Sequence, residues 1–439
     1  MKKIISSIMA VIMLLSLISL AGCGEKSADV YFLNFKPESA NAYKKIAEAY
    51  ENETGVKVKI VTAAAGGYEQ TLKSEIAKNE PPTIFQINGP VGFSSWEKYC
   101  ADITDSAFAG LLTDKNLAVT KNGKIYAVPY VIEAYGIIYN NAIMEKYFAL
   151  PNKKVSINSA EEINNFATLK AVVEDMTSKK QELGIKGVFA STSLSTGEDW
   201  RWQTHLANMA AYYEFKDNEN IVSAALDAKE IEFKYAENFK NIFDLYINNS
   251  VSEKTLLGSK TVEDSMAEFA LSQCAMVQNG TWAWSQISGV KGNTVKSEDV
   301  KMLPIYTGIN GEEEIGLCTG TENYFAINKN VSEEKQKESL NFLYWLFTSD
   351  TGKAYVKDFL GFTTPFKTMA EYTPEDPLAK EVSRYLNDQS KTNIPWVFTA
   401  FPSDAFKKEF GNALLEYAQG SATFDQVKKR VIDKWKSER

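Results

Sequence analysis

The sequence contains little arginine and histidine. Among its 439 residues there is one histidine, His205, and there are four arginines, Arg201, Arg384, Arg430 and Arg439. A single histidine excludes a metal site built from several imidazoles and leaves one candidate base for a Ser-His-Asp triad. Arginine is the residue that proteins favour for holding phosphates and carboxylates. Its scarcity therefore argues against an anionic ligand and for a neutral one.

Positive charge is also scarce relative to negative charge. Lysine and arginine number 48 against 56 acids, which gives a net charge of -8. Because no overall basic field is present, we expect no nucleic-acid partner. A chain of 439 residues is too long for one ordinary core, so two domains or lobes are expected. No spacing typical of a metal or cofactor site occurs, and we expect neither group.

The N-terminus combines a basic start with a short apolar segment. Lys2 and Lys3 precede an apolar run over residues 4–20, and Leu20-Ala21-Gly22-Cys23 follows. This order resembles a bacterial lipobox and predicts a signal peptide over 1–22, lipidation of Cys23 and a tether over 23–29. The alternative is a non-lipidated signal with a coincidental cysteine. Several acyl chains would hold the protein on the extracytoplasmic side of the cell membrane.

Cysteine gives no framework elsewhere in the chain. Cys100, Cys274 and Cys318 are odd in number and irregular in spacing. We expect buried small side chains rather than a disulfide scaffold.

The segment after the tether alternates strand and helix patterns. Strands are expected over 30–33, 56–60 and 83–87, with a helix ending at Gly55 and another over 69–78. Such a β-α-β-α-β order predicts a parallel sheet covered by helices. Ligands of open α/β sheets bind at the carboxyl ends of the strands, which here are the loops 34–39, 63–68 and 88–93.

The remainder is mostly helical between further short strands. Strands are expected over 124–129, 136–140, 275–277 and 324–327. Ser332 and Ser403 each begin a helix, and residues 423–426 form a capping box that opens the last one.

Several segments, taken in order, resemble a known family. They are PPTIFQINGP (81–90), GKIYAVPY (123–130), GIIYNNAIMEKYF (136–148), AMVQNGTWAW (275–284) and LLEYAQGSATFDQVKKRVIDKW (414–435). Together with the lipobox they are similar to the extracellular solute-binding proteins of bacterial ABC importers. The similarity is to the carbohydrate-binding, maltose-binding-protein-like group.

The resemblance implies a two-lobed α/β fold of the periplasmic-binding-protein type, with hinge crossings and a ligand cleft between the lobes. We expect an N-terminal lobe from 30–139 plus about 285–340, and a C-terminal lobe from about 140–284 plus about 341–439. It also implies a monomer that delivers its solute to a transmembrane permease and performs no catalysis.

Two tryptophans head the candidate binding residues. A sugar-binding cleft needs flat aromatic faces for the sugar rings and planar polar groups for adjacent hydroxyls. Trp282 and Trp284 follow a strand and a glycine, where a side chain can face the cleft, and Asn279 shapes the same turn. The family position favours ligand contact for Trp282, whereas core packing is an equal alternative for Trp284.

Residues 198–202 form the densest polar and aromatic group of the chain. Trp200 and Arg201 either face the cleft from the start of a helix or, for Arg201, form a surface ion pair with Glu198. Trp202 continues an apolar stripe and is expected in the core.

The strand-end loops supply further polar candidates, namely Asn34, Glu38, Tyr68, Glu69 and Asn88. The two glutamates could instead stabilise the first turns of helices. Glu133 is an acid in an apolar segment at the expected lobe crossing, so it should have a partner or face the cleft. Trp396 and Phe398 are weaker candidates, and packing is the favoured interpretation for them.

Three alternatives to oligosaccharide binding remain. A polyamine would suit the acids Glu38, Glu69 and Glu133, and iron could use the adjacent Tyr212 and Tyr213. A secreted glycoside-acting enzyme would need two carboxylates across one bond. The resemblance favours an oligosaccharide-binding protein over each of them.

Overall fold

The computed structural model describes residues 28–64, 67–372 and 375–439. The signal peptide and Cys23 lie outside these residues, as does most of the tether. Within the described part, no helix has the length and apolar character needed to cross a bilayer. Cys100, Cys274 and Cys318 are buried and unpaired, as expected.

The first lobe is built on a mixed sheet that contains the expected parallel unit. Its strand order is β2(Val58–Thr62)-β1(Val30–Asn34)-β3(Ile84–Asn88)-β10(Asn323–Ile327)-β5(Lys124–Pro129)-β4(Val119–Lys121). β1 runs parallel to β2 and β3, and β10 runs antiparallel to β3 and β5. The β-α-β-α-β prediction is therefore confirmed.

Alternating side chains place helices on both faces of this sheet. Phe32 points into a core shared with α2 (Ala40–Thr54) and α13 (Glu333–Thr348), whereas Leu33 points into a second core with α3 (Tyr68–Glu75) and α4 (Gly89–Trp96). α2 ends at Gly55, whose φ of 75° is left-handed and suits a residue without Cβ. α14 (Asp350–Tyr355) and a π-helix over Val356–Leu360 continue the first lobe.

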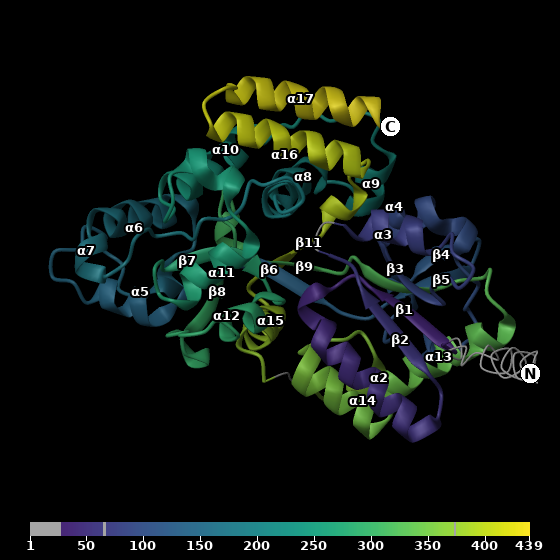
Figure 1. The fold of residues 1–439 in the computed structure, drawn as a ribbon. Helices are drawn as coiled ribbons and strands as arrows, with labels where there is room; N and C mark the ends of the chain where they lie inside the picture. The colour runs from purple at the N-terminus through teal and green to yellow at the C-terminus, as the bar shows by residue number, and fades with distance from the viewer. Residues whose placement is uncertain (1–27, 65–66, 373–374) are drawn as a thin grey trace, which may run out of the picture.

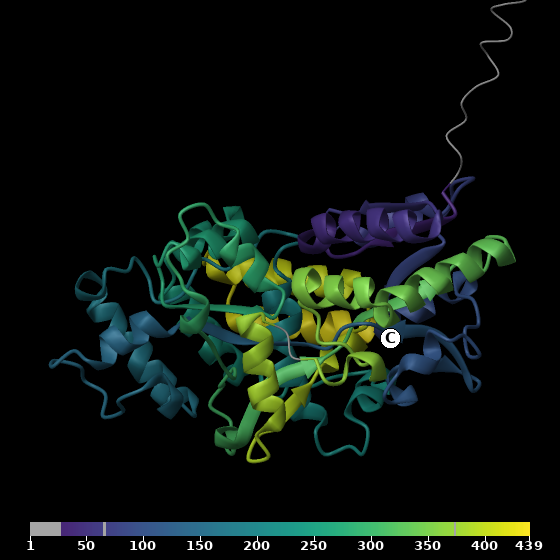
Figure 2. The same cartoon turned by 90° about the horizontal axis from the view of Figure 1, so that it is seen from below.

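The second lobe has its own sheet, ordered β11(Thr392–Pro395)-β9(Ile315–Gly320)-β6(Glu133–Asn140)-β7(Met276–Gly280), with β8 (Val300–Leu303) also paired to β6. All eight residues of β6 are buried, because helices cover both faces. In Figure 1 this lobe lies to the left of the first, and the turned view of Figure 2 keeps the two side by side.

The helices of the second lobe divide between two cores. One core holds residues of α5 (Asn141–Phe148), α6 (Phe166–Ser178), α8 (Ala207–Phe215), α10 (Ala236–Asn248), α16 (Asp404–Ala418) and α17 (Phe424–Ser437). The other holds residues of α11 (Val262–Ala270), α12 (Ala283–Ser288) and α15 (Pro377–Asn387). α7 (Lys180–Leu183) and α9 (Ile221–Asp227) are short. The predicted capping box of α17 is present, with Thr423 and Gln426 bonded reciprocally.

The lobe membership of several segments differs from the boundaries expected from the sequence. β8 and β9 fall within 285–340, yet they pair in the second sheet. α13 extends into 341–439, yet Phe342 and Phe347 pack in the core of the first lobe. Apolar periodicity shows that a helix covers a sheet but does not show which sheet.

The chain passes between the lobes through residues 130–132, through residues 321–322, and again between Phe366 and α15. These crossings place the ends of β6 and β9 at the lobe boundary, where the candidate site lies.

Candidate functional site

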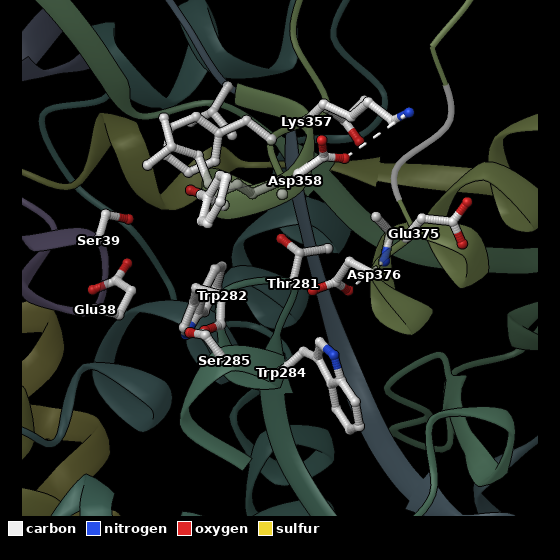
Figure 3. Close-up of a pocket in the computed structure, with 18 of the residues that line it drawn as sticks. Glu38, Ser39, Thr281, Trp282, Trp284, Ser285, Lys357, Asp358, Glu375 and Asp376 are labelled. Atoms are coloured by element: carbon white, nitrogen blue, oxygen red, sulfur yellow. Dashed lines mark hydrogen bonds and ion pairs between the residues drawn. The ribbon is translucent and has the colours of Figure 1, made fainter. Parts of the chain in front are cut away.

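A cavity of about 520 Å³ lies at the boundary of the two lobes. Its volume falls within the range of small-molecule sites. The first lobe contributes Glu38, Ser39 and residues 357–363, the first crossing contributes residues 131–132, and Glu133 comes from the start of β6. The second lobe contributes Thr281, Trp282, Trp284, Ser285, Ser288, Asp376 and Ala379, and Glu375 lies just before α15. In Figure 3, Glu38 and Ser39 lie on one side, Glu375 and Asp376 on the other, and Trp282 between them.

Trp282 reaches the cavity because β7 ends at Gly280 and α12 begins at Ala283. The indole lies against the glycine: a Cβ on Gly280 would be 2.3 Å from the ring. Only a residue without a side chain leaves room for the tryptophan there. The indole Nε1 of Trp282 is buried and has no hydrogen-bond partner in the protein.

A second tryptophan lies on a second glycine. Gly320 ends β9, and a Cβ on it would be 2.6 Å from Cγ of Trp396. β6 runs between β7 and β9, so that Tyr135 lies opposite Gly280 and Glu133 lies opposite Gly320. The edge of the second sheet at the crossings is thus flanked by two indoles.

A π-helix over Arg201–Leu206 brings further rings to this edge. The His205 ring stacks on Tyr135 at 4.1 Å and lies 5.4 Å from Trp282 between ring centroids. Trp200 lies 5.8 Å from Trp282. π-Helices are rare and occur often at functional sites, and sequence periodicity gives no sign of one.

Arg201 is buried against the Trp200 ring. Arg201 is 1% exposed, and its Cζ atom lies 3.9 Å from the centroid of the Trp200 ring. None of its three side-chain nitrogens has a hydrogen-bond partner in the protein. Burial lowers the pKa of Arg201 to about 9, and burial together with the Arg201 charge lowers the pKa of His205. The surface ion pair with Glu198 considered for Arg201 is not formed.

Glu133 both lines the cavity and has a partner. Lys36 Nζ lies 2.7 Å from Glu133 Oε1 and 3.7 Å from Glu38 Oε1, while Asn323 donates to Glu133 Oε2 at 3.2 Å. Burial alone would lower the pKa of Lys36, but the carboxylates of Glu133 and Glu38 outweigh it and raise that pKa. This ion pair joins the first lobe to the start of β6.

Asn34 and Tyr68 bond within the first lobe. The Asn34 amide donates to the Lys36 carbonyl at 2.7 Å and accepts from the Lys36 backbone N–H at 3.0 Å. The Tyr68 hydroxyl accepts from the Gln86 N–H at 2.7 Å. Neither residue lines the cavity.

Glu69, Asn88 and Asn279 are also outside the residues that line the cavity. Glu69 accepts from the Trp96 indole at 2.8 Å, and Asn88 ends β3 just before α4. Asn279 is fully buried, where it accepts from the Gly280 N–H.

The structure adds site residues that the sequence patterns did not indicate. The π-helix over 356–360 brings Lys357, Asp358 and Phe359 to the cavity, and the start of α15 brings Asp376. Trp396 and Phe398 pack in the core of the second lobe, as expected, 6.2 and 5.2 Å from the His205 ring. Trp202 is in the core, as expected.

Comparisons with known proteins indicate what the chain is similar to. The family model for bacterial extracellular solute-binding proteins matches residues 45–384. The melibiose/raffinose/stachyose-binding protein MelE of Bacillus subtilis (strain 168) is 26% identical over 135 residues, 30% of this chain and 32% of that protein. A maltooligosaccharide ABC transporter solute-binding lipoprotein of Streptococcus pneumoniae (strain ATCC BAA-255 / R6) is 30% identical over 155 residues, 32% of this chain and 36% of that protein.

The aligned part of the chain therefore spans about a third of these relatives' length. A solved structure, the solute-binding protein RafE in complex with raffinose, covers 93% of this chain and 99% of its own with a TM-score of 0.70. Its sequence identity of 17% supports the fold alone. The expected two-lobed α/β fold is confirmed.

Proposed function

The chain belongs to the family of bacterial extracellular solute-binding proteins, and on that premise we propose that it binds an oligosaccharide at the lobe boundary and delivers it to an ABC-importer permease. This proposal rests on two features of the site: aromatic rings face the cavity, and polar atoms beside these rings have no hydrogen-bond partner in the protein. MelE and the pneumococcal lipoprotein, which by their names bind saccharides, support the same class of ligand.

The chemistry of the site suits a polyhydroxylated ring. Trp282 and Trp284 offer aromatic faces, and Thr281 and Ser285 offer hydroxyls beside them. Sugars need both kinds of contact, because ordering a well-hydrated ligand costs several kcal/mol that many contacts must offset. A micromolar dissociation constant corresponds to about -8 kcal/mol.

Among the sequence candidates, four line the cavity and suit direct contact with the ligand: Glu38, Glu133, Trp282 and Trp284. Trp200 lies beside Trp282 and against Arg201, and neither Trp200 nor Arg201 lines the cavity, so they suit the support of Trp282. The other five suit a supporting role in backbone and core bonds: Asn34, Tyr68, Glu69, Asn88 and Asn279. Binding by both lobes would favour their closure about the crossings. We extend the proposal to a monomer that is lipid-anchored through Cys23, faces the extracytoplasmic side and performs no catalysis.

A polyamine is the second candidate, because several carboxylates line the cavity. Most of them are already engaged, however. Glu133 pairs with Lys36, Glu375 lies 2.9 Å from Lys380, and Asp376 caps α15 through backbone N–H groups. Engaged carboxylates leave little free negative charge for a polycation, so the saccharide is favoured.

Isothermal titration with raffinose, stachyose, maltotriose and spermidine tests the proposal. We expect at least one saccharide to bind and Trp282→Ala to weaken its binding by at least ~1 kcal/mol, because an aromatic face is lost. Trp345→Ala, in the first lobe where the indole bonds Glu53 and does not line the cavity, is the matched control and should bind normally. Thermal stabilisation by spermidine but by none of the sugars would overturn the saccharide proposal. Unchanged affinity in Trp282→Ala would remove Trp282 from the site.

A further inference from the structure

The first described residues lie close in the chain to the proposed lipid anchor. Five peptide steps separate Cys23 from Ala28, where the described chain begins. Such a segment spans at most about 18 Å when it is fully extended. A folded chain of this size has a radius of gyration of about 22 Å. The tether is therefore too short to let the anchored molecule turn freely, and the surface around Ala28 must lie near the membrane.

That surface is the edge of the first sheet at which its parallel strands begin. The N–H groups of Asp29 and Val30 donate to the Lys57 carbonyl, just before β2, at 3.0 and 3.1 Å. β3 begins at the same edge because it runs parallel to β1, and the antiparallel β10 ends there. The other end of β1 leads to Lys36, which pairs with Glu133 at the lobe boundary. The cavity thus lies at the opposite end of this sheet from the anchor.

Exposed charged residues surround this edge. We define the anchor face by five of them: Asp29, Lys57, Glu80, Lys98 and Lys329. The Lys329 N–H donates to the Tyr99 carbonyl at 2.8 Å, which places Lys98 beside Lys329. The Asp29 carboxylate accepts from the Lys57 backbone N–H at 3.0 Å. The ion pairs of neighbouring lysines, Lys78 with Glu75 and Lys121 with Glu97, do not include the three lysines of the anchor face. These three ammonium groups are therefore available to an anionic partner.

The two lobes also differ in charge. Residues 28–132 and 323–372, which build the first lobe, contain 17 lysines and 18 acids. Residues 133–322 and 373–439, which build the second lobe, contain 28 basic residues and 37 acids. An anionic lipid surface repels the strongly negative second lobe and attracts exposed lysines that lie close to it. Charge and tether length therefore favour the same orientation.

We propose that the anchored protein rests on anionic lipid through the anchor face, with the cavity and the second lobe directed away from the membrane. This inference rests on the lipid anchoring included in the proposed function and adds the surface that meets the lipid. Lys57, Lys98 and Lys329 bind lipid phosphates as point charges. In this orientation the lobe boundary is accessible to solutes that arrive from outside the cell.

Energy transfer to a labelled lipid tests the orientation. The acylated mature protein is placed on phosphatidylglycerol vesicles that contain a rhodamine-labelled lipid. A dye on Asn330→Cys, beside Lys329, should transfer energy several-fold more strongly than a dye on Asn152→Cys, in the turn that follows α5 at the far end of the second lobe (Figure 1). Both asparagines are exposed, and the native cysteines of the described chain are buried and are not labelled. Equal transfer from the two dyes would overturn the proposal.

A triple variant, Lys57→Gln/Lys98→Gln/Lys329→Gln, tests the lysines of the anchor face. Each lysine close to an anionic surface favours this orientation by ~5-fold. The variant should therefore lose most of the energy transfer from the dye at residue 330. Because the attraction is electrostatic, the difference between variant and wild type should disappear at about 1 M salt, where the Debye length is about 3 Å.

The matched control removes the same charge from exposed lysines of the second lobe: Lys254→Gln/Lys291→Gln/Lys296→Gln. Its energy transfer from residue 330 should equal that of the wild type. Equal transfer in the two triple variants would show that the lysines of the anchor face do not meet the lipid, and the proposal would be wrong. Mass spectrometry of the N-terminal peptide checks acylation. A peptide without acyl chains would overturn the lipid anchoring together with this inference, whereas saccharide titration tests the rest of the proposed function independently.

Discussion

The two faces of the lobe boundary differ in how their polar groups are satisfied. On the first-lobe side, Asn34 and Tyr68 bond to their own lobe, and the buried atoms without a partner include two oxygens, Tyr43 Oη and Asn323 Oδ1. On the second-lobe face, Arg201, Trp282 and Trp396 have buried donors without protein partners. Because buried polar groups are almost always hydrogen-bonded, the difference indicates that the second lobe offers nitrogen donors to a ligand, whereas the unpartnered atoms of the first lobe are oxygens.

The tryptophans show the same contrast inside one lobe. In the helical interior of the second lobe, the Trp202 indole donates to the Ser193 carbonyl at 2.9 Å and the Trp435 indole donates to the Ala228 carbonyl at 3.0 Å. At the cleft edge, the indoles of Trp282 and Trp396 donate to nothing in the protein. An indole N–H bonded within the protein therefore distinguishes Trp202 and Trp435 from Trp282 and Trp396, a difference that sequence alone does not show.

Lys36→Met should cause the largest loss of stability, because it breaks the ion pair between Lys36 of the first lobe and Glu133 of the second. The variant leaves the Glu133 carboxylate buried without its cation, and we expect the free energy of unfolding to fall by about 3–5 kcal/mol. Urea unfolding at pH 7 measures it.

The double variant Lys36→Met/Glu133→Gln is the control, because it removes both charges and should recover much of the loss. A loss below about 1 kcal/mol in the single variant would mean that the pair contributes little, as exposed pairs do, and that the two faces are joined by other contacts.

A pair of Trp→Phe variants tests the contrast between interior and cleft. Both lose packing volume, but Trp202→Phe also leaves the Ser193 carbonyl without its donor. We expect Trp202→Phe to lower the free energy of unfolding by about 1–2 kcal/mol more than Trp396→Phe does. Trp396→Phe should instead weaken saccharide binding by about 1 kcal/mol.

Urea unfolding and isothermal titration of both proteins provide the two readouts. Equal stability losses with intact binding in Trp396→Phe would show that its indole belongs to the core and that the contrast between interior and cleft is wrong.

The sequence predicted the first lobe better than the second. The expected segments 30–33, 56–60 and 83–87 correspond to strands separated by one helix each, so local pattern and final pairing agree. β9 and β10 are neighbours in the chain but pair in different sheets. The sheet that each strand joins depends on pairing with a strand distant in sequence, β6 for β9 and β3 for β10. No local pattern encodes this pairing.

For the candidate site, the sequence patterns indicated the types of residue present better than they indicated which positions line the cavity. Trp282 and Arg201 stand at the lobe boundary, where aromatic and polar residues cluster locally in the chain. The sequence favours Asn34 because it ends a strand, but its amide bonds to the backbone of its own turn. Phe359 was not foreseen, because a π-helix over 356–360 places it at the cavity and shifts the side-chain register from that of an α-helix.

A change at Glu322 should have the smallest effect on the free energy of unfolding. It tests whether the acids at the two crossings differ in charge. Glu133 at the first crossing is paired, whereas burial of Glu322 at the second raises its pKa from 4.5 to about 7, with Lys407 and Lys36 opposing the shift. The folded state then holds a proton that the unfolded state has lost, so the stabilising contribution is complete below about pH 4.5 and disappears as the pH rises through about 7.

Glu322→Gln keeps a neutral side chain at every pH, so it should match the wild type at pH 4.5 and exceed its free energy of unfolding at pH 8. Because Glu322 is partly exposed, we expect a gain of about 1 kcal/mol, less than the pKa shift alone would give. Urea unfolding of both proteins at the two pH values measures the difference and cancels the titration of other acids. A difference that does not change between pH 4.5 and pH 8 would show that Glu322 ionises normally, and the two crossings would then not differ in charge.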